Sequence, residues 1–181
     1  MAVDIRLTYE DYCLLSTDGK RHEIIDGEHF VTPSPLTLHQ RVVMRLGYHL
    51  MAYLHDHPLG EVFSAPFDVV FSRFDVVEPD LLYISKDRSS IVTRKNVQGA
   101  PDLVVEVLSE GTAHIDRDTK LKLYSRFGVR EYWVIDPEAP SAEIHRAGNE
   151  GLQLVVNLSA DGSLASTLLP GLAIPLGKLI E

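Results

Sequence analysis

The sequence has little cysteine and no long apolar segment. The single cysteine, Cys13, excludes an intrachain disulfide and any zinc site built from several cysteines. No apolar run approaches the ~18 residues that a membrane-spanning helix needs. The first residues, Met1–Arg6, lack the basic and then apolar order of a secretion signal. We therefore expect a cytoplasmic protein with no membrane partner.

Two common catalytic motifs are also missing. The chain has neither a glycine-rich phosphate loop nor the Gly-x-Ser-x-Gly elbow of serine hydrolases. Ser109 and His114 have no acidic residue placed near them in the pattern of a catalytic triad. There is also no internal repeat and no low-complexity tract. A phosphate-loop enzyme and a serine hydrolase are therefore poor interpretations of this chain.

Positive charge is scarce as well. The formal net charge is −9, which argues against a protein that coats nucleic acid without specificity. The charge is uneven, because residues 86–130 hold nine basic and six acidic side chains and so carry +3, while the rest carries −12. An imbalance of this size arises easily by chance, so it has little weight.

The length and composition predict one globular domain, residues 1–181, because 45% of the side chains are hydrophobic and the chain is long enough to bury a core. Apolar periodicity and capping residues predict a short helix at 8–15 and long helices at 36–55 and 116–127, the last ended by Gly128. Residues 86–98 are a polar loop, and the apolar tail 168–180 is expected to pack on the body. Apolar runs between turn residues predict strands at 21–25, 28–31, 62–71 (bent at Pro66), 76–84, 102–108, 130–135, 142–145 and 152–158.

The order of these elements predicts an α/β fold with a mixed sheet. Residues 102–108 are almost continuously apolar, which is typical of a central strand covered on both faces. Helix 116–127 connects this strand to strand 130–135, and such a crossover normally joins parallel strands with a right-handed turn. Asp26-Gly27 supplies the positive φ angles of a tight hairpin. The two long helices are expected to flank the sheet.

Two acidic residues lie in strand-like apolar runs, where a charge is costly unless it has a task. These are Asp80 and Glu106. Asp102 shares a strand face with Glu106, but a separation of four residues means ~13 Å, so the two cannot hold one ion. A neighbouring strand lies only ~4.8 Å away, which makes Asp80 the partner of Glu106. With the backbone carbonyl of Val107, they would offer oxygen ligands to a hard cation such as Mg²⁺.

A basic group beside this pair has two candidates. Lys120 and Lys122 point about 200° apart on a helix that turns ~100° per residue, so only one can face the sheet. Tyr124 lies one turn beyond Lys120 and shares its side. A plain alternative is a surface ion pair between Asp116 and Lys120, worth only about a few tenths of a kcal/mol. Helix geometry leaves both open, and for His39 a capping or surface role is the simpler interpretation.

Several stretches resemble a known family, and together they cover almost the whole chain from Thr8 onward. They resemble the restriction-endonuclease-like family of the PD-(D/E)XK nuclease superfamily, which was long of unknown function. The stretch 120–136 is the most specific. The matching segments are Arg21–Glu28, Ser34-Pro35 with His39, Glu78–Leu81, Pro101–Ser109, Asp116-Arg117 with Lys120 and Tyr124, Gly128–Pro137 and Leu169–Leu172.

The resemblance implies a restriction-endonuclease-like α/β fold, in which a mixed central sheet is flanked by helices and extended by an N-terminal hairpin and C-terminal β additions. It implies that Asp80 and Glu106 are the two catalytic acids and metal ligands, with Val107 as a further ligand. Many related enzymes carry a lysine in the strand, where this chain has Leu108. In this family the lysine moves to the following helix, where it falls on Lys120.

The resemblance adds three supporting positions. Glu23 and His39 match family positions to which no definite role is assigned. Tyr124 lies in the matching stretch with Lys120. The implied function is hydrolysis of DNA by an endonuclease that uses Mg²⁺ or Mn²⁺.

Two other functions stay open. One is a degenerate nuclease domain that binds DNA or a protein partner without turnover, and the other is a purely structural role for the acids. A single-domain enzyme that cuts both strands is also expected to form a homodimer, for which the apolar tail from Leu168 offers an interface.

Overall fold

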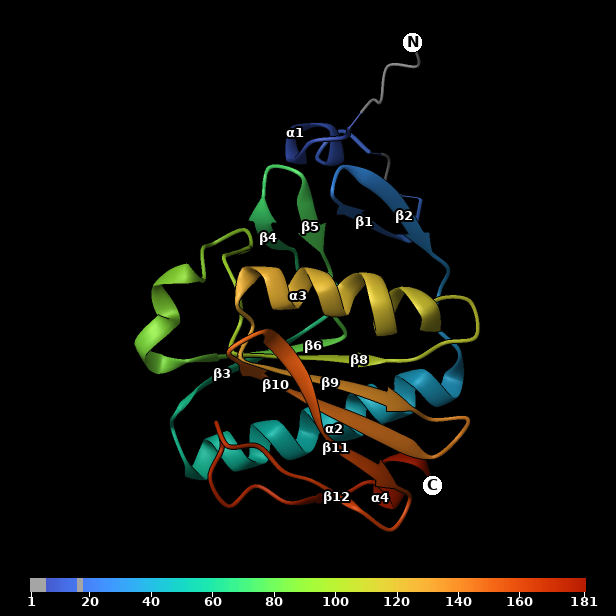
Figure 1. Cartoon of the computed structure of the whole chain (residues 1–181), viewed down its shortest axis with the longest axis vertical. Helices are drawn as coiled ribbons and strands as arrows, with labels where there is room; N and C mark the ends of the chain where they lie inside the picture. Colours follow the sequence, from blue (N-terminus) through green and yellow to red (C-terminus); the bar gives the residue numbers. More distant parts are fainter. Residues whose placement is uncertain (1–5, 16–17) are drawn as a thin grey trace.

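The computed structural model describes residues 6–15 and 18–181. Its largest element is a six-stranded mixed sheet (Figure 1). None of the helices in these residues is long and apolar enough to cross a membrane. The strands lie in the order β11 (Gly151–Ser159), β10 (Ser141–Gly148), β9 (Glu131–Asp136), β8 (Leu103–Val107), β6 (Leu81–Ser85) and β3 (Gly60–Ser64).

A smaller sheet lies on one side of the large one (Figure 1). It has five strands, in the order β2 (Glu28–Thr32), β1 (Arg21–Ile25), β5 (Asp75–Val77), β4 (Val69–Ser72) and β7 (Val97–Gln98). The predicted hairpin of β1 and β2 is confirmed, with φ of +53° at Asp26 and +81° at Gly27. Two very short strands, β12 (Ser163–Leu164) and β13 (Ile174–Pro175), pair near the C-terminus.

Helices α2 (Thr37–Asp56) and α3 (Leu121–Phe127) cover opposite faces of the large sheet (Figure 1). Gly128 ends α3 with φ +80°, as predicted, and the crossover from β8 to β9 joins parallel strands. α3 follows directly on a π-helical turn, Ile115–Lys120, where a regular helix was expected. Two short helices, α1 (Tyr9–Tyr12) and α4 (Gly177–Ile180), lie toward the ends. Thr8 and Asp11 form a capping box at the start of α1, which ends before the predicted residue 15.

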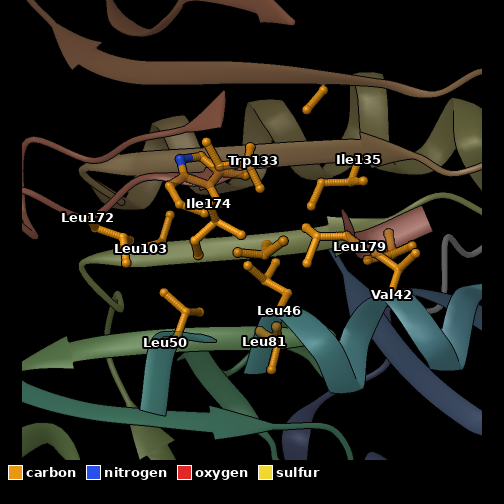
Figure 2. Close-up of a cluster of buried hydrophobic side chains, with 14 of the residues drawn as sticks. Val42, Leu46, Leu50, Leu81, Leu103, Trp133, Ile135, Leu172, Ile174 and Leu179 are labelled. Atoms are coloured by element: carbon orange, nitrogen blue, oxygen red, sulfur yellow. The ribbon is translucent and has the colours of Figure 1, made fainter. Parts of the chain in front are cut away.

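Strand β8 is buried on both faces, which explains its nearly continuous apolar sequence. Leu103, Val105 and Val107 belong to the core that α2 and the C-terminal segment complete (Figure 2). Val104 and Leu108 belong to the core on the α3 side. Because side chains alternate along a strand, Glu106 also faces α3. It is the only charged residue of β8, and its neighbours on the same face, Val104 and Leu108, belong to the apolar core on the α3 side.

Two predicted strands each turn out to be two strands in different sheets. Run 62–71 splits into β3 and β4, and run 76–84 splits into β5 and β6. Pro66 and Pro79 lie at the breaks, and a proline has no amide hydrogen with which to continue a ladder. Asp80 therefore precedes β6 rather than lying within a strand. The chain passes from one sheet to the other at this residue.

Two further segments differ in detail from expectation. The predicted polar loop 86–98 contains a 3-10 helix, Lys86–Ile91, and strand β7. The apolar tail packs on the body as predicted, because five of its side chains are buried in the core on the α2 side: Leu169, Leu172, Ile174, Leu176 and Leu179.

Candidate functional site

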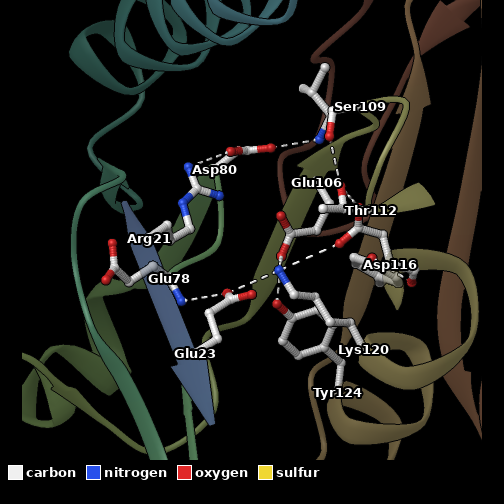
Figure 3. Close-up of polar contacts among 12 residues, drawn as sticks. Arg21, Glu23, Glu78, Asp80, Glu106, Ser109, Thr112, Asp116, Lys120 and Tyr124 are labelled. Carbon is white, nitrogen blue, oxygen red and sulfur yellow. Dashed lines mark hydrogen bonds and ion pairs between the residues drawn. The ribbon is translucent and has the colours of Figure 1, made fainter. Parts of the chain in front are cut away.

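Asp80 and Glu106 meet where β6 and β8 lie side by side. The strands are antiparallel and Leu81 pairs with Val105, so the residue before Leu81 is opposite the residue after Val105. The two carboxylates line a pocket of about 320 Å³ together with Lys120 and Asp116 (Figure 3). The neighbour relation expected from strand spacing is therefore present.

The Asp80 carboxylate has three hydrogen-bond donors. Arg21 Nη2 lies 2.9 Å from Oδ1, while His39 Nε2 and the backbone amide of Val107 lie 3.0 Å and 2.8 Å from Oδ2. The side chain is only 3% exposed, and burial alone would raise its pKa. The hydrogen bond from His39 and the charge of Arg21 outweigh burial, so the pKa of Asp80 lies below its usual range and the group stays ionised.

Glu106 has fewer donors and more acidic neighbours. Lys120 Nζ and the Tyr124 hydroxyl donate to the same oxygen, Oε1, at 3.0 Å and 2.7 Å. Burial raises the pKa of Glu106 to about 8, and although Lys120 opposes this, the charges of Asp116 and Asp80 add to it. The surroundings of Glu106 are therefore short of positive charge.

Lys120 points into the site, and Lys122 points away from it. Lys120 Nζ lies 3.0 Å from Glu23 Oε1, 3.0 Å from Glu106 Oε1 and 3.5 Å from Asp116 Oδ1 (Figure 3). An ammonium group has three hydrogens, so these contacts match its full donor capacity. Lys122 has a side chain 74% exposed and pairs with another surface residue. Whether Lys120 acts in catalysis stays a prediction.

The idea of a surface ion pair between Asp116 and Lys120 is wrong. Their side chains are 5% and 4% exposed, so the pair is part of the buried site. The π-helical turn that contains both residues is a type of distortion often found at functional sites. The sequence carried a signal, the i,i+4 spacing of the two residues, but that spacing does not tell a buried pair from an exposed one.

Arg21 is a member of the site that the sequence interpretation missed. It lies two residues before Glu23 on β1, so the two side chains share one face of the hairpin and reach Asp80 and Lys120 respectively. Glu23 also accepts a hydrogen bond from the Glu78 backbone amide at 2.9 Å. The alternation of Arg21 and Glu23 is visible in the sequence, but nothing local indicates that the hairpin covers the end of β6.

The site has a surplus of negative charge. Four buried carboxylates, Glu23, Asp80, Glu106 and Asp116, face two cations, Arg21 and Lys120. Within residues 6–15 and 18–181, no three acidic, histidine or cysteine side chains converge as a ready metal-binding cluster. The two carboxylates at the strand ends and a nearby backbone oxygen are still a donor set that suits a hard cation, since Mg²⁺ usually keeps several water ligands.

Comparisons with known proteins identify the family of the chain. The model of the family Uma2, described as "Putative restriction endonuclease", matches residues 8–177. The chain belongs to the Uma2 family. This confirms the resemblance on which the site residues were assigned, although it does not by itself assign a role to any Uma2 residue. A search of curated proteins finds no match.

A solved structure shares the fold of this Uma2 protein. It is the crystal structure of "a putative nuclease belonging to DUF820" from Anabaena variabilis ATCC 29413. The two chains are 16% identical and superpose with a TM-score of 0.79, over 96% of this chain and 97% of the other. At this identity the likeness speaks for the fold alone. The predicted restriction-endonuclease-like α/β fold is thereby confirmed.

Proposed function

We propose that this Uma2 protein is a DNA endonuclease that hydrolyses phosphodiester bonds with Mg²⁺ or Mn²⁺. The family and the fold support a nuclease. The observation that carries the finer proposal is the pair of facing buried carboxylates, Asp80 and Glu106, in a pocket that also contains the buried Lys120. We place this activity in the cytoplasm, in line with the composition of the chain.

The residues present fit a divalent cation. With all four carboxylates ionised, the surplus of two negative charges equals the charge of one such ion. The raised pKa of Glu106 shows that without the ion the site is short of positive charge. Asp80 and Glu106 would hold the ion with the carbonyl of Val107, whose amide already contacts Asp80. In an extended strand the N–H and C=O of one residue point to the same side. A bound divalent ion supplies Lewis acidity and lowers the pKa of its water.

The remaining residues have supporting tasks. Burial would lower the pKa of Lys120, but Glu106, Glu23 and Asp116 outweigh it and keep the pKa well above its usual value. Lys120 therefore remains charged at the wall of the pocket, where it stabilises negative charge that develops on the phosphorus. The Tyr124 hydroxyl fixes the Glu106 carboxylate by its 2.7 Å hydrogen bond.

A homodimer is part of the proposal, but its interface differs from the one expected. Most apolar side chains of the tail from Leu168 are buried in the core on the α2 side, so they are not available for an interface with a second subunit. On α2, however, Met44, Tyr48 and Met51 are 69%, 65% and 57% exposed and share one helix face. The same face continues to the exposed His55 one turn beyond Met51.

Such a face is complementary to a second copy of itself. When two copies of α2 pair antiparallel about a two-fold axis, the apolar side chains of the two faces meet. We expect light scattering to show a dimer that Tyr48→Glu converts to monomer. Leu154→Glu, at an exposed leucine of β11 (53% exposed), is the matched control and leaves the dimer intact. A monomeric wild type, or dissociation by the control alone, contradicts this interface.

Two observations bear on the degenerate, binding-only domain. Arg21 and Lys120 already contact the carboxylates that an ion would need, and no three-residue metal cluster is formed within residues 6–15 and 18–181. Such a protein would bind DNA or a protein partner and show no turnover at any metal concentration.

Calorimetric titration of Mn²⁺ separates the two functions. Wild-type protein is expected to bind Mn²⁺, and Asp80→Ala is expected not to bind it. Asp118→Ala, which removes an exposed carboxylate (67% exposed) from the same helical segment, is the control and should bind like wild type. Binding followed by metal-dependent cleavage of plasmid DNA supports the nuclease. Absence of both in wild type leaves the binding-only domain.

A further inference from the structure

Arg21 has more hydrogen-bond donors than the protein uses. Among the described residues its guanidinium makes one hydrogen bond, from Nη2 to Asp80 Oδ1 at 2.9 Å. A guanidinium carries five N–H hydrogens, so four of them remain. Whichever hydrogen of Nη2 is given to Asp80, one complete edge of the group, with two nearly parallel N–H bonds, is left free. Such an edge matches two oxygens of one anionic group.

The unused donors of Arg21 are open to solvent. In the part of the chain that the structure describes, only His39 Nδ1 is a side-chain nitrogen or oxygen that is both buried and unpaired, so Nε and Nη1 of Arg21 are not closed off. The side chain lines the candidate pocket and is 19% exposed. Figure 3 shows the guanidinium pointing from β1 toward Asp80 and Glu106. A ligand that enters the pocket can therefore reach these N–H groups.

Arg21 is also the cation of the pocket that has donors to spare. Among the described residues that line it, the fixed positive charges are Arg21 and Lys120. Lys120 has three hydrogens and three carboxylate contacts, with Glu23, Glu106 and Asp116. The charge of Lys120 thus acts on a substrate without a free hydrogen to donate. Arg21 can donate to the substrate directly.

The free edge of Arg21 suits a phosphodiester. Each phosphate of DNA carries its negative charge on two non-bridging oxygens, which a guanidinium edge binds with two parallel hydrogen bonds. Because carboxylates outnumber cations in this pocket, an anionic substrate needs a cation that it can touch. The hydroxyl groups of the lining are neutral and supply no such charge.

We propose that Arg21 binds a phosphate of the DNA substrate through the free edge of its guanidinium, while the Nη2 bond to Asp80 holds the group in place. This inference rests on the proposed function. Arg21 places the phosphate beside the carboxylates that carry the chemistry. It transfers no proton, because a guanidinium stays charged at every working pH.

The salt dependence of DNA binding tests this contact. Each phosphate that a protein neutralises contributes about 0.9 to the slope of log K against log salt for duplex DNA. Arg21→Gln should therefore lower the slope by about 0.9 and weaken binding about tenfold. Fluorescence anisotropy of a short labelled duplex, with Ca²⁺ in place of Mn²⁺, measures both. Arg73→Gln, at a side chain 64% exposed and outside the pocket, is the matched control and should keep the wild-type slope.

Arg21→Lys separates the phosphate contact from the bond to Asp80. A lysine keeps one charge and a donor for Asp80 but has no edge with two parallel hydrogens. We expect Arg21→Lys to keep the salt slope and the Mn²⁺ affinity of wild type, while kcat/KM falls about tenfold. If Arg21 serves only to hold Asp80, Arg21→Lys cleaves like wild type and Arg21→Gln keeps the salt slope. Either of these results overturns the inference.

The inference and the proposed function fail in different ways. A wild type whose salt slope depends on Arg21, but which cleaves DNA with no divalent metal, overturns the nuclease and supports the phosphate contact in a binding-only domain. A wild type that cleaves DNA, with an unchanged slope in Arg21→Gln, overturns the phosphate contact and supports the nuclease. A wild type that does not bind DNA overturns both.

Discussion

Strand β8 has a buried carboxylate near each end of its α3-facing side, and the two are held in opposite ways. Asp102, just before the strand, is fully buried and accepts hydrogen bonds from the Ser85 amide at 2.8 Å and from Arg88 and Arg130 at 3.0 Å each. Glu106, near the other end, shares its one lysine with two further carboxylates. A carboxylate on the same face of the strand thus has different surroundings at its two ends.

The two pKa values follow from this difference. Burial would raise the pKa of Asp102, but the Ser85 amide and the two arginines outweigh it and hold the pKa below its usual range. At Glu106 burial prevails, and the pKa rises to about 8. Asp102 has all its donors within the protein and so stabilises the fold, whereas Glu106 is short of positive charge, which is what the proposed divalent cation would supply.

The largest expected effect is on activity. Glu106→Gln keeps an oxygen for Lys120 and Tyr124 but removes the charge that would hold a metal, so cleavage should fall about 10²–10³-fold. Asp102→Asn should leave the activity of the folded protein close to wild type. Plasmid nicking by both variants, measured at a temperature where both are folded, checks this. Equal losses in the two would abolish the distinction between the strand ends.

The second effect is on thermal stability in the presence of metal. An ion that binds only the native state should stabilise wild type by about 2.7 kcal/mol at a concentration of 100 Kd. The gain should disappear in Glu106→Gln and persist in Asp102→Asn, and thermal melts with and without Mn²⁺ measure it. A Mn²⁺-dependent rise of Tm in Glu106→Gln as large as in wild type would place the ion elsewhere.

The third effect is on the free energy of unfolding without metal. Here Asp102→Asn is expected to have the larger effect and Glu106→Gln the smaller one. Asp102→Asn weakens a fully buried acceptor of three donors and should cost about 1–3 kcal/mol. The loss of stability stays in this range because the side chains of Arg88 and Arg130, at 34% and 54% exposed, can turn to water. Glu106→Gln should cost nothing or stabilise, because it relieves repulsion. Urea unfolding of the metal-free variants gives both free energies.

The smallest effect is the dependence of stability on pH. Because the folded-state pKa of Glu106 is raised, its contribution is present at low pH and is lost as the pH rises toward about 8. Because that of Asp102 is lowered, its contribution is present at neutral pH and is lost as the pH falls through the folded-state pKa. Metal-free Glu106→Gln should lose the fall in stability between pH 4.5, the ordinary pKa of a glutamate, and about 8. Asp102→Asn should lose part of the fall in stability at acid pH. Melts across the pH range test both, and a Glu106→Gln profile identical to wild type would contradict the raised pKa.

Much of the fold could be predicted because the signals were local. The alternation in β1 and β2, the glycine after Asp26, the period of α2 and the stop at Gly128 each act within a few residues. The two split strands were missed because nothing in a run such as 76–84 indicates a change of sheet, apart from its proline. Pairing with β8 decides where β6 begins, and this is a long-range property.

The site divides in the same way. Asp80, Glu106 and Lys120 were found because a charge in an apolar run is visible in the sequence, and the resemblance decided between the two lysines. Arg21 and the burial of Asp116 were missed, since both depend on how the hairpin and the π-helical turn meet the sheet. The catalytic roles and the single-domain organisation stay predictions.

Leu108 has a consequence for how related proteins can be recognised. The position belongs to the core on the α3 side, and the lysine arrives instead from the next helical segment, 14 residues after Glu106. A motif search that demands a lysine two residues after the second acid would pass over this chain. A search for an acid in an apolar strand followed by Asp-x-x-x-Lys in a helix would retrieve it. The same search would retrieve other chains in which an apolar residue takes this strand position and packs in the core.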